Sequence, residues 1–260
     1  MLVIFLCGKM RIKAVLFDMF DTLAVIDDNY EVYNHAMVCM HKYIIKQGIE
    51  VTFEQFREVY IKARNKLNDV ADKTLEEPHF DQRVQIALKL LGYDLDPKNP
   101  IITGATEKFF TCLLKSVRID ENAKSTLENL HDNYKLGIIS NYSISEGVHA
   151  VLKSNKMCEL FDVVVVSCDV NKRKPSPEIF QIALKKMNIL AEEAVFVGDR
   201  AYVDISGAHA TGMKAIYVKR RFDQDFEKFT PDIVIDSLAE LPYALNALSH
   251  IVEHCSNKVS

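Results

Sequence analysis

Short apolar runs rich in β-branched residues recur along the chain, and each is followed by a turn-like or polar segment. A strand that is apolar along its whole length is buried on both faces, which is typical of a parallel sheet covered by helices. The runs that predict such strands are Ala14–Phe17, Leu136–Ile139, Val163–Val166, Ala194–Val197, Ala215–Val218 and Ile233–Ile235.

Helical periodicity fills the intervals between the later runs. Apolar residues recur there at three- and four-residue spacing, which places them on one face of a helix. The predicted helices are Glu121–Leu130, Ser145–Asn155 and Pro177–Met187, the last with proline in its first turn. Strands that alternate with helices predict an α/β fold with a doubly wound, Rossmann-like parallel sheet as its core.

The interval between the first and second runs is far longer than the roughly dozen residues that one crossover needs. We predict that residues 29–116 form an inserted all-helical cap, and that residues 1–28 and 117–260 form the core. Loops at the carboxyl ends of parallel strands surround the ligand crevice, so we interpret the cap as a lid over the site rather than as a structural elaboration. Its predicted helices are 29–47, 52–69, 80–91 and 106–115. The turn signals that divide them are Gln47-Gly48, Glu77-Pro78 and the segment Asp94–Pro100.

Composition and net charge limit the kinds of partner that the protein is expected to bind. The chain has 260 residues, of which 48% are hydrophobic, enough for one α/β domain with an inserted subdomain. Its net charge is −4 and its pI about 6.1, so it lacks the basic character typical of nucleic-acid-binding proteins. We expect a small-molecule partner, with no nucleic acid and no membrane; the oligomeric state stays open.

The N-terminal apolar run, Met1–Cys7, is too short to span a bilayer. Its basic neighbours follow the run, whereas a signal peptide has them in front. We therefore expect a cytoplasmic protein, with residues 1–9 as a floppy extension and Met10 as an equally sensible start.

Six cysteines are scattered along the chain, without a Cys-x-x-Cys pair and without a histidine cluster beside them. That spacing predicts reduced thiols and argues against a structural zinc site. The cysteines are Cys7, Cys39, Cys112, Cys158, Cys168 and Cys255.

Carboxylates follow two of the predicted strands. Asp18 ends the first, and Asp199 ends the strand Ala194–Val197, with Asp204 five residues further on. A strand-end aspartate is often only a helix cap or turn former. If the two strands are neighbours, however, the carboxylates converge and need a divalent cation, and carboxylate oxygens suit Mg²⁺. Asp18 could then bind the metal through one oxygen and attack with the other.

Two further segments suit an anion. Ser140 and Asn141 follow the second run, where a hydroxyl and backbone N–H groups at a helix start can bind a phosphoryl oxygen. The basic segment Asn171–Pro177 contains Lys174, held before a proline-fixed turn from which its ammonium can reach the cleft. Each segment alone is more often an ordinary turn or a solvated loop.

Together, in this order, the four segments resemble the motifs of the haloacid dehalogenase-like superfamily, in the subfamily with a helical cap after the first strand. The resemblance covers residues 11–240, and the ordered set is specific although each part alone is not. The motifs are Asp18-x-x-x-Thr22-Leu23, Ser140-Asn141, Lys174-Pro175, and Gly198-Asp199 with Asp204.

The resemblance implies a role for each motif residue. Asp18 would be the nucleophile and a ligand of Mg²⁺, together with the carbonyl of Phe20, with Asp199, and with Asp204 directly or through water. Lys174, rather than Lys172 or Arg173, would neutralise charge during catalysis. The residues implied to bind substrate are Thr22, Ser140, Asn141 and Lys174.

One position departs from the family pattern. Phosphatases of this family usually carry a second aspartate two residues after the nucleophile, which protonates the leaving group and later activates water. Here that residue is Phe20, which cannot transfer a proton. General acid–base help is typically worth about 10²–10⁴-fold. Turnover is then modest, or the substrate has a good leaving group, or another group helps; Asp21, where the family often has glycine, is one catalytic candidate.

Three functions stay open. The leading hypothesis is a Mg²⁺-dependent phosphatase that hydrolyses a small phosphomonoester, of the sugar or triose phosphate type, through an aspartyl-phosphate intermediate. A 2-haloacid dehalogenase has an aromatic residue at the Phe20 position, but works without metal and lacks the Gly198-Asp199 pair. A non-catalytic binding protein is the third. The cap residues that could reach the substrate include Tyr30, Arg57, Arg64 and Arg83, and the sequence does not separate them.

Overall fold

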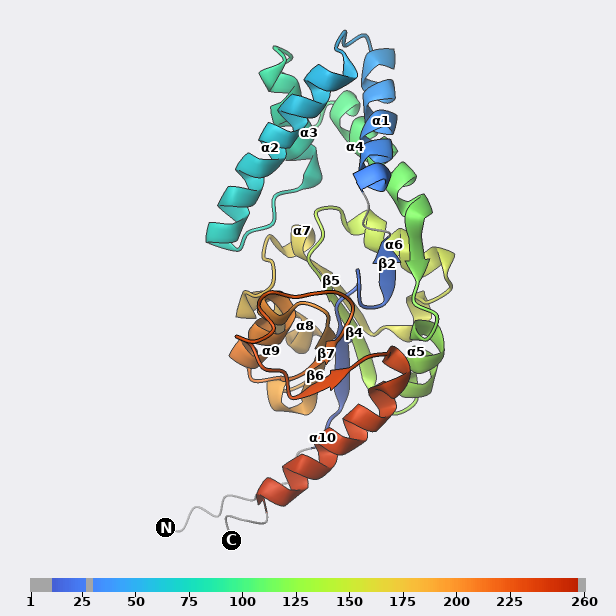
Figure 1. The fold of residues 1–260 in the computed structure, drawn as a ribbon, viewed down its shortest axis with the longest axis vertical. Helices are drawn as coiled ribbons and strands as arrows, with labels where there is room; N and C mark the ends of the chain where they lie inside the picture. The colour runs from blue at the N-terminus through green and yellow to red at the C-terminus, as the bar shows by residue number, and fades with distance from the viewer. Residues whose placement is uncertain (1–10, 27–29, 257–260) are drawn as a thin grey trace.

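A computed structural model describes residues 11–26 and 30–256, with side chains up to residue 249. In Figure 1 the helices of the inserted segment stand together at one end of the molecule, and a sheet with its covering helices fills the other. The expected N-terminal extension, residues 1–9, and the predicted start of the cap at residue 29 lie outside the described residues. No helix in the described part of the chain is both long enough and apolar enough to cross a membrane.

The core is a six-stranded sheet in the order β5-β4-β1-β6-β7-β8, and every pairing in it is parallel. β1 lies in the middle, and Phe17 pairs with Ile138 of β4 on one side and Val197 of β6 on the other. This confirms the predicted α/β class and each of the six predicted strands. The strands are β1 (Ala14–Phe17), β4 (Lys135–Ser140), β5 (Val163–Val166), β6 (Ala194–Gly198), β7 (Lys214–Val218) and β8 (Ile233–Ile235).

Helices cover both faces of the sheet (Figure 1). Successive strand residues point to opposite faces. Val15 and Phe17 share a core cluster with α5, α6 and α10, whereas Ala14 and Leu16 share one with α8 and α9. The helices of the core are α5 (Ala123–His131), α6 (Ser145–Ser154), α7 (Ser167–Val170), α8 (Pro177–Met187), α9 (Ser206–Thr211) and α10 (Leu241–Ser256).

The inserted segment has an apolar core of its own, built from all four of its helices. Two of the helices differ from the predicted ranges. One continues to Thr74, and another begins six residues early at Pro100, because Asn99 caps it and accepts from the N–H of Ile101. The helices are α1 (Tyr30–Lys46), α2 (Phe53–Thr74), α3 (Phe80–Leu90) and α4 (Pro100–Leu113).

A two-stranded antiparallel ribbon lies where the chain passes between cap and core. It consists of β2 (Ala24–Ile26) and β3 (Val117–Ile119). The sequence did not predict it, because three residues are too few to show a strand period. The remaining short elements are 3₁₀ turns at Leu114–Ser116, Cys158–Leu160, Ala191–Glu193 and Leu238–Glu240.

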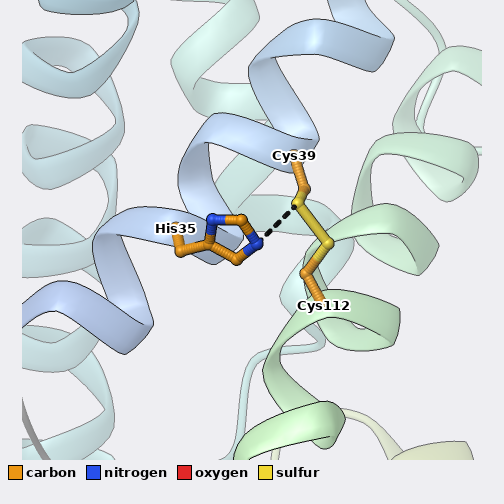
Figure 2. Close-up of side chains that lie close together, drawn as sticks. All are labelled: His35, Cys39 and Cys112. Atoms are coloured by element: carbon orange, nitrogen blue, oxygen red, sulfur yellow. Dashed lines mark hydrogen bonds between the residues drawn. A yellow bond between two sulfur atoms is a disulfide. The ribbon is translucent and has the colours of Figure 1, made fainter.

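The prediction that all cysteines are reduced thiols is wrong for one pair. Cys39 of α1 and Cys112 of α4 form a disulfide, with their Cα atoms 6.7 Å apart (Figure 2). The two residues are 73 positions apart in the chain and meet only because α1 packs against α4, which spacing alone cannot reveal. His35 lies one helical turn before Cys39, with its Nε2 3.8 Å from the Cys39 sulfur. Cys158 and Cys168 are free thiols.

Candidate active site

Three predicted aspartates meet at the carboxyl end of the sheet. β1 and β6 are neighbours, so Asp18 and Asp199 leave adjacent strand ends, and the N–H of Asp18 donates to the carbonyl of Val197 at 2.9 Å. Asp204 joins them from the segment after β6. One carboxylate oxygen from each lies within 4.8 Å of the others. The sequence predicted that these carboxylates converge if the two strands are neighbours. The strands are neighbours, and the carboxylates do converge.

The local backbone explains why Asp204 can reach this position. It lies in a single π-helical turn, Ala201–Ile205, of a kind often found at functional sites. Its Oδ2 accepts from the N–H of Arg200 at 3.0 Å. A Cβ added to Gly198 would lie 2.5 Å from the Asp204 carboxylate, so only glycine at this strand end lets the two segments pack.

Lys174 lies among the acids and is 1% exposed. Its Nζ is 2.6 Å from Oδ1 of Asp18 and 2.7 Å from Oδ1 of Asp204. Burial alone would lower the pKa of Lys174, but the two carboxylates outweigh burial and hold the pKa above its usual value. The lysine is therefore a fixed positive charge next to the predicted nucleophile.

Asn141 determines where that lysine stands. Its Nδ2 donates to the carbonyl of Lys174 at 2.8 Å, and its Oδ1 accepts from the N–H of Lys174 at 2.7 Å. Both ends of the amide are thus bound to the main chain of Lys174. Asn141 positions the lysine in this structure, and its predicted contact with substrate stays a prediction.

Asp199 is the least satisfied of the acids. It is 1% exposed, and neither of its carboxylate oxygens has a hydrogen-bond partner among the described residues. Burial, and then repulsion from Asp18 and Asp204, raise the pKa of Asp199 to about 8. Burial also raises the pKa of Asp18 to about 6; Lys174 opposes this rise and Asp204 adds to it. Three carboxylates thus lie close together with one ammonium, and both oxygens of Asp199 are unpaired in the described structure. This arrangement fits a hard divalent cation, which would balance the excess negative charge.

Ser140 and Thr22 lie in the same region. Ser140 ends β4 beside β1 and is 1% exposed, so it leaves the sheet at the same edge as Asp18. Thr22 is fully buried in the loop after β1, its hydroxyl has no partner in the described structure, and its carbonyl accepts from Arg220 at 2.8 Å. Their contacts with substrate stay predictions.

Phe20 and Asp21 point their side chains into different surroundings. The ring of Phe20 packs on that of Tyr142, with centroids 4.3 Å apart. Asp21 has a left-handed backbone (φ 67°), which glycine adopts freely and aspartate tolerates. Its carboxylate pairs with Arg221, and its carbonyl accepts from Arg220. The structure thus gives the Asp21 carboxylate a cationic partner, and its catalytic role stays a prediction.

The cap contacts the catalytic loop through the segment between α2 and α3. The N–H of Arg173, next to Lys174, donates to the carbonyl of Leu75 at 2.9 Å. Glu77 lies 3.6 Å from Nε of Arg173 and accepts from Ser167 at 3.1 Å, and burial raises the pKa of its carboxyl. Sequence reasoning missed Glu77 and Tyr142. Arg173 faces the cap, whereas Lys174 lies among the acids; the role of Lys174 in catalysis stays a prediction.

The chain matches a family of hydrolases and is similar to individual proteins of known activity. The family model of the haloacid dehalogenase-like hydrolases matches residues 15–218. A glyceraldehyde 3-phosphate phosphatase from Methanopyrus kandleri is 29% identical over 240 residues, which cover 90% of this chain and 95% of that protein.

Two solved structures are similar over nearly the whole chain. A 2-haloacid dehalogenase from Pseudomonas syringae pv. Tomato DC3000 has a TM-score of 0.70 at 26% identity, covering 91% of this chain and 99% of that one. A HAD phosphatase from Thermococcus onnurineus has a TM-score of 0.64 at 28% identity, covering 90% and 98%.

Proposed function

This chain belongs to the haloacid dehalogenase-like hydrolases, and from that membership we propose that it is a magnesium-dependent phosphatase acting on a small phosphomonoester of the sugar or triose phosphate type. The observation that carries the proposal is the arrangement of Asp18 between the charged Lys174 and the unpaired carboxylate of Asp199. The phosphatase name of the Methanopyrus relative supports it.

In the proposed reaction an oxygen of Asp18 attacks the phosphorus atom, and the bond from phosphorus to the ester oxygen breaks. The leaving group departs as an alkoxide with the bonding electron pair and takes a proton from solvent water. A second water then attacks the phosphorus of the aspartyl phosphate and gives up a proton to solvent, so that inorganic phosphate leaves and the Asp18 carboxylate is regenerated. Lys174 offsets the repulsion between the Asp18 carboxylate and the phosphate dianion. A magnesium ion held by Asp18, Asp199, Asp204 and the carbonyl of Phe20 would neutralise phosphoryl oxygens.

Phe20 affects which phosphate esters the enzyme hydrolyses fastest. With no acid at this position, the departing oxygen receives no proton from it, so the rate depends steeply on the pKa of the leaving alcohol. We expect aryl phosphates to be hydrolysed faster than alkyl phosphates that bind equally well.

A dehalogenase is the second candidate, and two observations favour it: the aromatic residue at position 20 and the similarity to the Pseudomonas structure. Against it stands Asp199, whose buried and unpaired carboxylate has no role in attack on a carbon–halogen bond, which needs no cation. The third candidate, a protein that binds without turnover, leaves the close packing of Asp18, Lys174 and Asp204 without a purpose.

The test is hydrolysis of p-nitrophenyl phosphate with Mg²⁺ and with EDTA, run beside halide release from 2-chloropropionate. The proposal expects phosphate release that requires Mg²⁺ and returns when Mg²⁺ replaces EDTA. Halide release that EDTA does not affect would establish the dehalogenase instead. The absence of both activities, over a panel of sugar and triose phosphates, would favour the binding protein.

A further inference from the structure

A cavity of about 180 Å³ lies between the cap and the core. The four cap helices form its walls, and the loop after β4 closes it on the core side. It is smaller than the roughly 300–1,000 Å³ of drug-sized pockets, as suits a small metabolite. The lining residues that matter here are Tyr60, Arg64, Phe80, Arg83, Phe109 and Tyr142.

The loop after β4, which contains Asn141 and Tyr142, belongs both to the cavity wall and to the candidate active site. Tyr142, which lines the cavity, directly follows Asn141, the residue that holds Lys174. The ring of Tyr142 packs on Phe20, two residues from Asp18. A substrate whose phosphoryl group meets Asp18 therefore has this cavity beside it to receive its other end.

Arg83 is the charged group of the cavity wall, and its charge is not balanced there. It is partly buried and forms no ion pair with any carboxylate in the described part of the chain, and its Nε has no hydrogen-bond partner there. Its guanidinium lies 4.8 Å from the Phe80 ring centre and donates to the Tyr60 hydroxyl at 3.4 Å. The nearby carboxylate of Glu77, whose burial-raised pKa Arg83 partly opposes, is already paired with Arg173.

The other lining residues add to this positive character. Arg64 also lines the cavity, and within the described part of the chain its only hydrogen-bond partner is the side chain of its neighbour Asn65. No aspartate or glutamate is among the described residues that line it. The hydroxyl of Tyr142 is buried without a partner in the described structure. A partly desolvated guanidinium that lines the same cavity as an unpaired hydroxyl, among aromatic rings, is suited to bind a carboxylate or phosphate.

We propose that this cavity binds the non-phosphoryl end of the substrate, and that Arg83 selects phosphomonoesters with a second anionic group, a carboxylate or another phosphate. The inference rests on the proposed phosphatase function and narrows it: among small phosphomonoesters, it favours those with a second anionic group over neutral sugar and triose phosphates. Arg83 is a specificity-determining residue in this view, with Arg64 as a weaker contributor because it is exposed.

The experiment compares 3-phosphoglycerate with glyceraldehyde 3-phosphate, which differ only by a carboxylate in place of an aldehyde. The wild-type enzyme should have the higher kcat/KM for 3-phosphoglycerate. Arg83→Gln should reduce the ratio of the two kcat/KM values by about 10- to 100-fold, because a hydrogen-bonded charge is lost from one substrate only. Arg83→Lys should keep part of the preference, since it keeps the charge and loses the bidentate geometry.

Arg57→Gln is the matched control. The sequence left Arg57 open as a cap residue that could reach the substrate, but in the structure it lines a different groove of the cap together with Glu54 and Glu58, and it is not among the residues that line this cavity. Like Arg83, it has a buried Nε without a partner in the described structure and stacks over an aromatic ring, that of Tyr30 at 5.6 Å. Its substitution should leave the substrate ratio unchanged. A wild-type enzyme that prefers the aldehyde, or an Arg83→Gln variant that loses both substrates equally while its melting temperature is kept, would overturn the inference.

A binding measurement separates this inference from the proposed function. In the Asp18→Asn background, calorimetry should show 3-phosphoglycerate binding about 10-fold or more weaker once Arg83→Gln is added. If p-nitrophenyl phosphate is not hydrolysed at all, the phosphatase proposal fails, and this titration still decides whether Arg83 binds the anion. Equal affinities in the two backgrounds would refute the anion site.

Discussion

The candidate catalytic centre in the core and the cavity between cap and core hold charge of opposite sign, which is buried in the core and only partly buried or exposed in the cavity. In the core, three carboxylates surround one ammonium, and Asp199 is left without a partner among the described residues. In the cap cavity, two arginines are present and no acid is among the described lining residues. A buried charge is costly unless something pairs with it. Under the proposed function, the core would hold a cation together with the phosphoryl group, and the cavity would hold the second anionic group of the substrate.

The two regions also differ in how they are held. The core charges sit on the ends of parallel strands, where the register of β1 and β6 fixes them. The cap residues sit on helices, whose positions depend on an aromatic core and on the disulfide between Cys39 and Cys112. A substitution among the core charges should therefore mainly lower turnover, whereas loss of the disulfide in the cap should mainly lower stability.

The largest expected effect comes from the core. Asp18→Asn should lower turnover of p-nitrophenyl phosphate by about 10⁴-fold or more, because it removes the attacking oxygen while nearly keeping the shape. The melting temperature should stay close to that of the wild type. Asp236→Asn, the same change at an exposed site, is the control and should keep full activity. An active Asp18→Asn enzyme would rule out covalent attack by this residue.

The next effect isolates the cap. Cys39→Ser combined with Cys112→Ser opens a loop that spans 73 positions, and such a loop is worth about 4 kcal/mol in the chain-entropy model. The free energy of unfolding, measured by urea titration, should fall by up to that amount, and a reducing agent should have the same effect on the wild type. Cys158→Ser, at a free and exposed thiol, should change little. A double variant as stable as the wild type would show that the bridge does not constrain the unfolded chain.

Phe20 joins the two regions, since it packs against the apolar clusters of both core and cap. Phe20→Asp places an acid at the position that the family pattern uses for proton transfer. It should raise kcat for alkyl phosphates relative to p-nitrophenyl phosphate by about 10²-fold, the low end of what general acid catalysis supplies. Phe20→Asn, which cannot give up a proton, separates this effect from loss of the Tyr142 contact. An equal change with both variants would mean that packing, not proton transfer, is responsible.

The sequence predicted the core far better than the cap, and the reason is physical. Asp18, Asp199 and Lys174 are near strand ends or a proline-fixed turn, so an ordered set of local motifs was sufficient to bring them together. The disulfide and the orientation of Arg83 depend on how helices pack, which no short pattern encodes. Asn141 shows the limit within the core itself: its position was predicted, but its bonds to Lys174 required the fold.

Asn99 and Pro100 are a different case. They carry a helix-start signal that was present in the sequence, and it was interpreted as a turn. The three-residue strands β2 and β3, by contrast, left no signal to find. The helix start was missed because one local pattern can indicate either a turn or a helix start. The two short strands were missed because only their long-range pairing makes them strands.

The smallest expected effect tests whether the core truly carries an excess of negative charge. In the folded metal-free protein the pKa of Asp199 is raised to about 8 from an ordinary value of 3.8. Between these two pH values the folded state keeps a proton that the unfolded state has released. The free energy of unfolding should therefore fall as pH rises from about 4 to about 8. Asp18, with its pKa raised to about 6, contributes with the same sign.

Magnesium should reverse that trend, because it binds the carboxylates only after they lose their protons. Urea unfolding at pH 5.5 and pH 8, with Mg²⁺ and with EDTA, measures both slopes, and the gain from Mg²⁺ should be larger at pH 8. Asp199→Asn has no proton to lose at this site, so its metal-free stability should depend less on pH and respond less to Mg²⁺. If the variant keeps the full magnesium response, then Asp199 does not hold the ion, and the comparison between an acidic core and a basic cap cavity loses its first half.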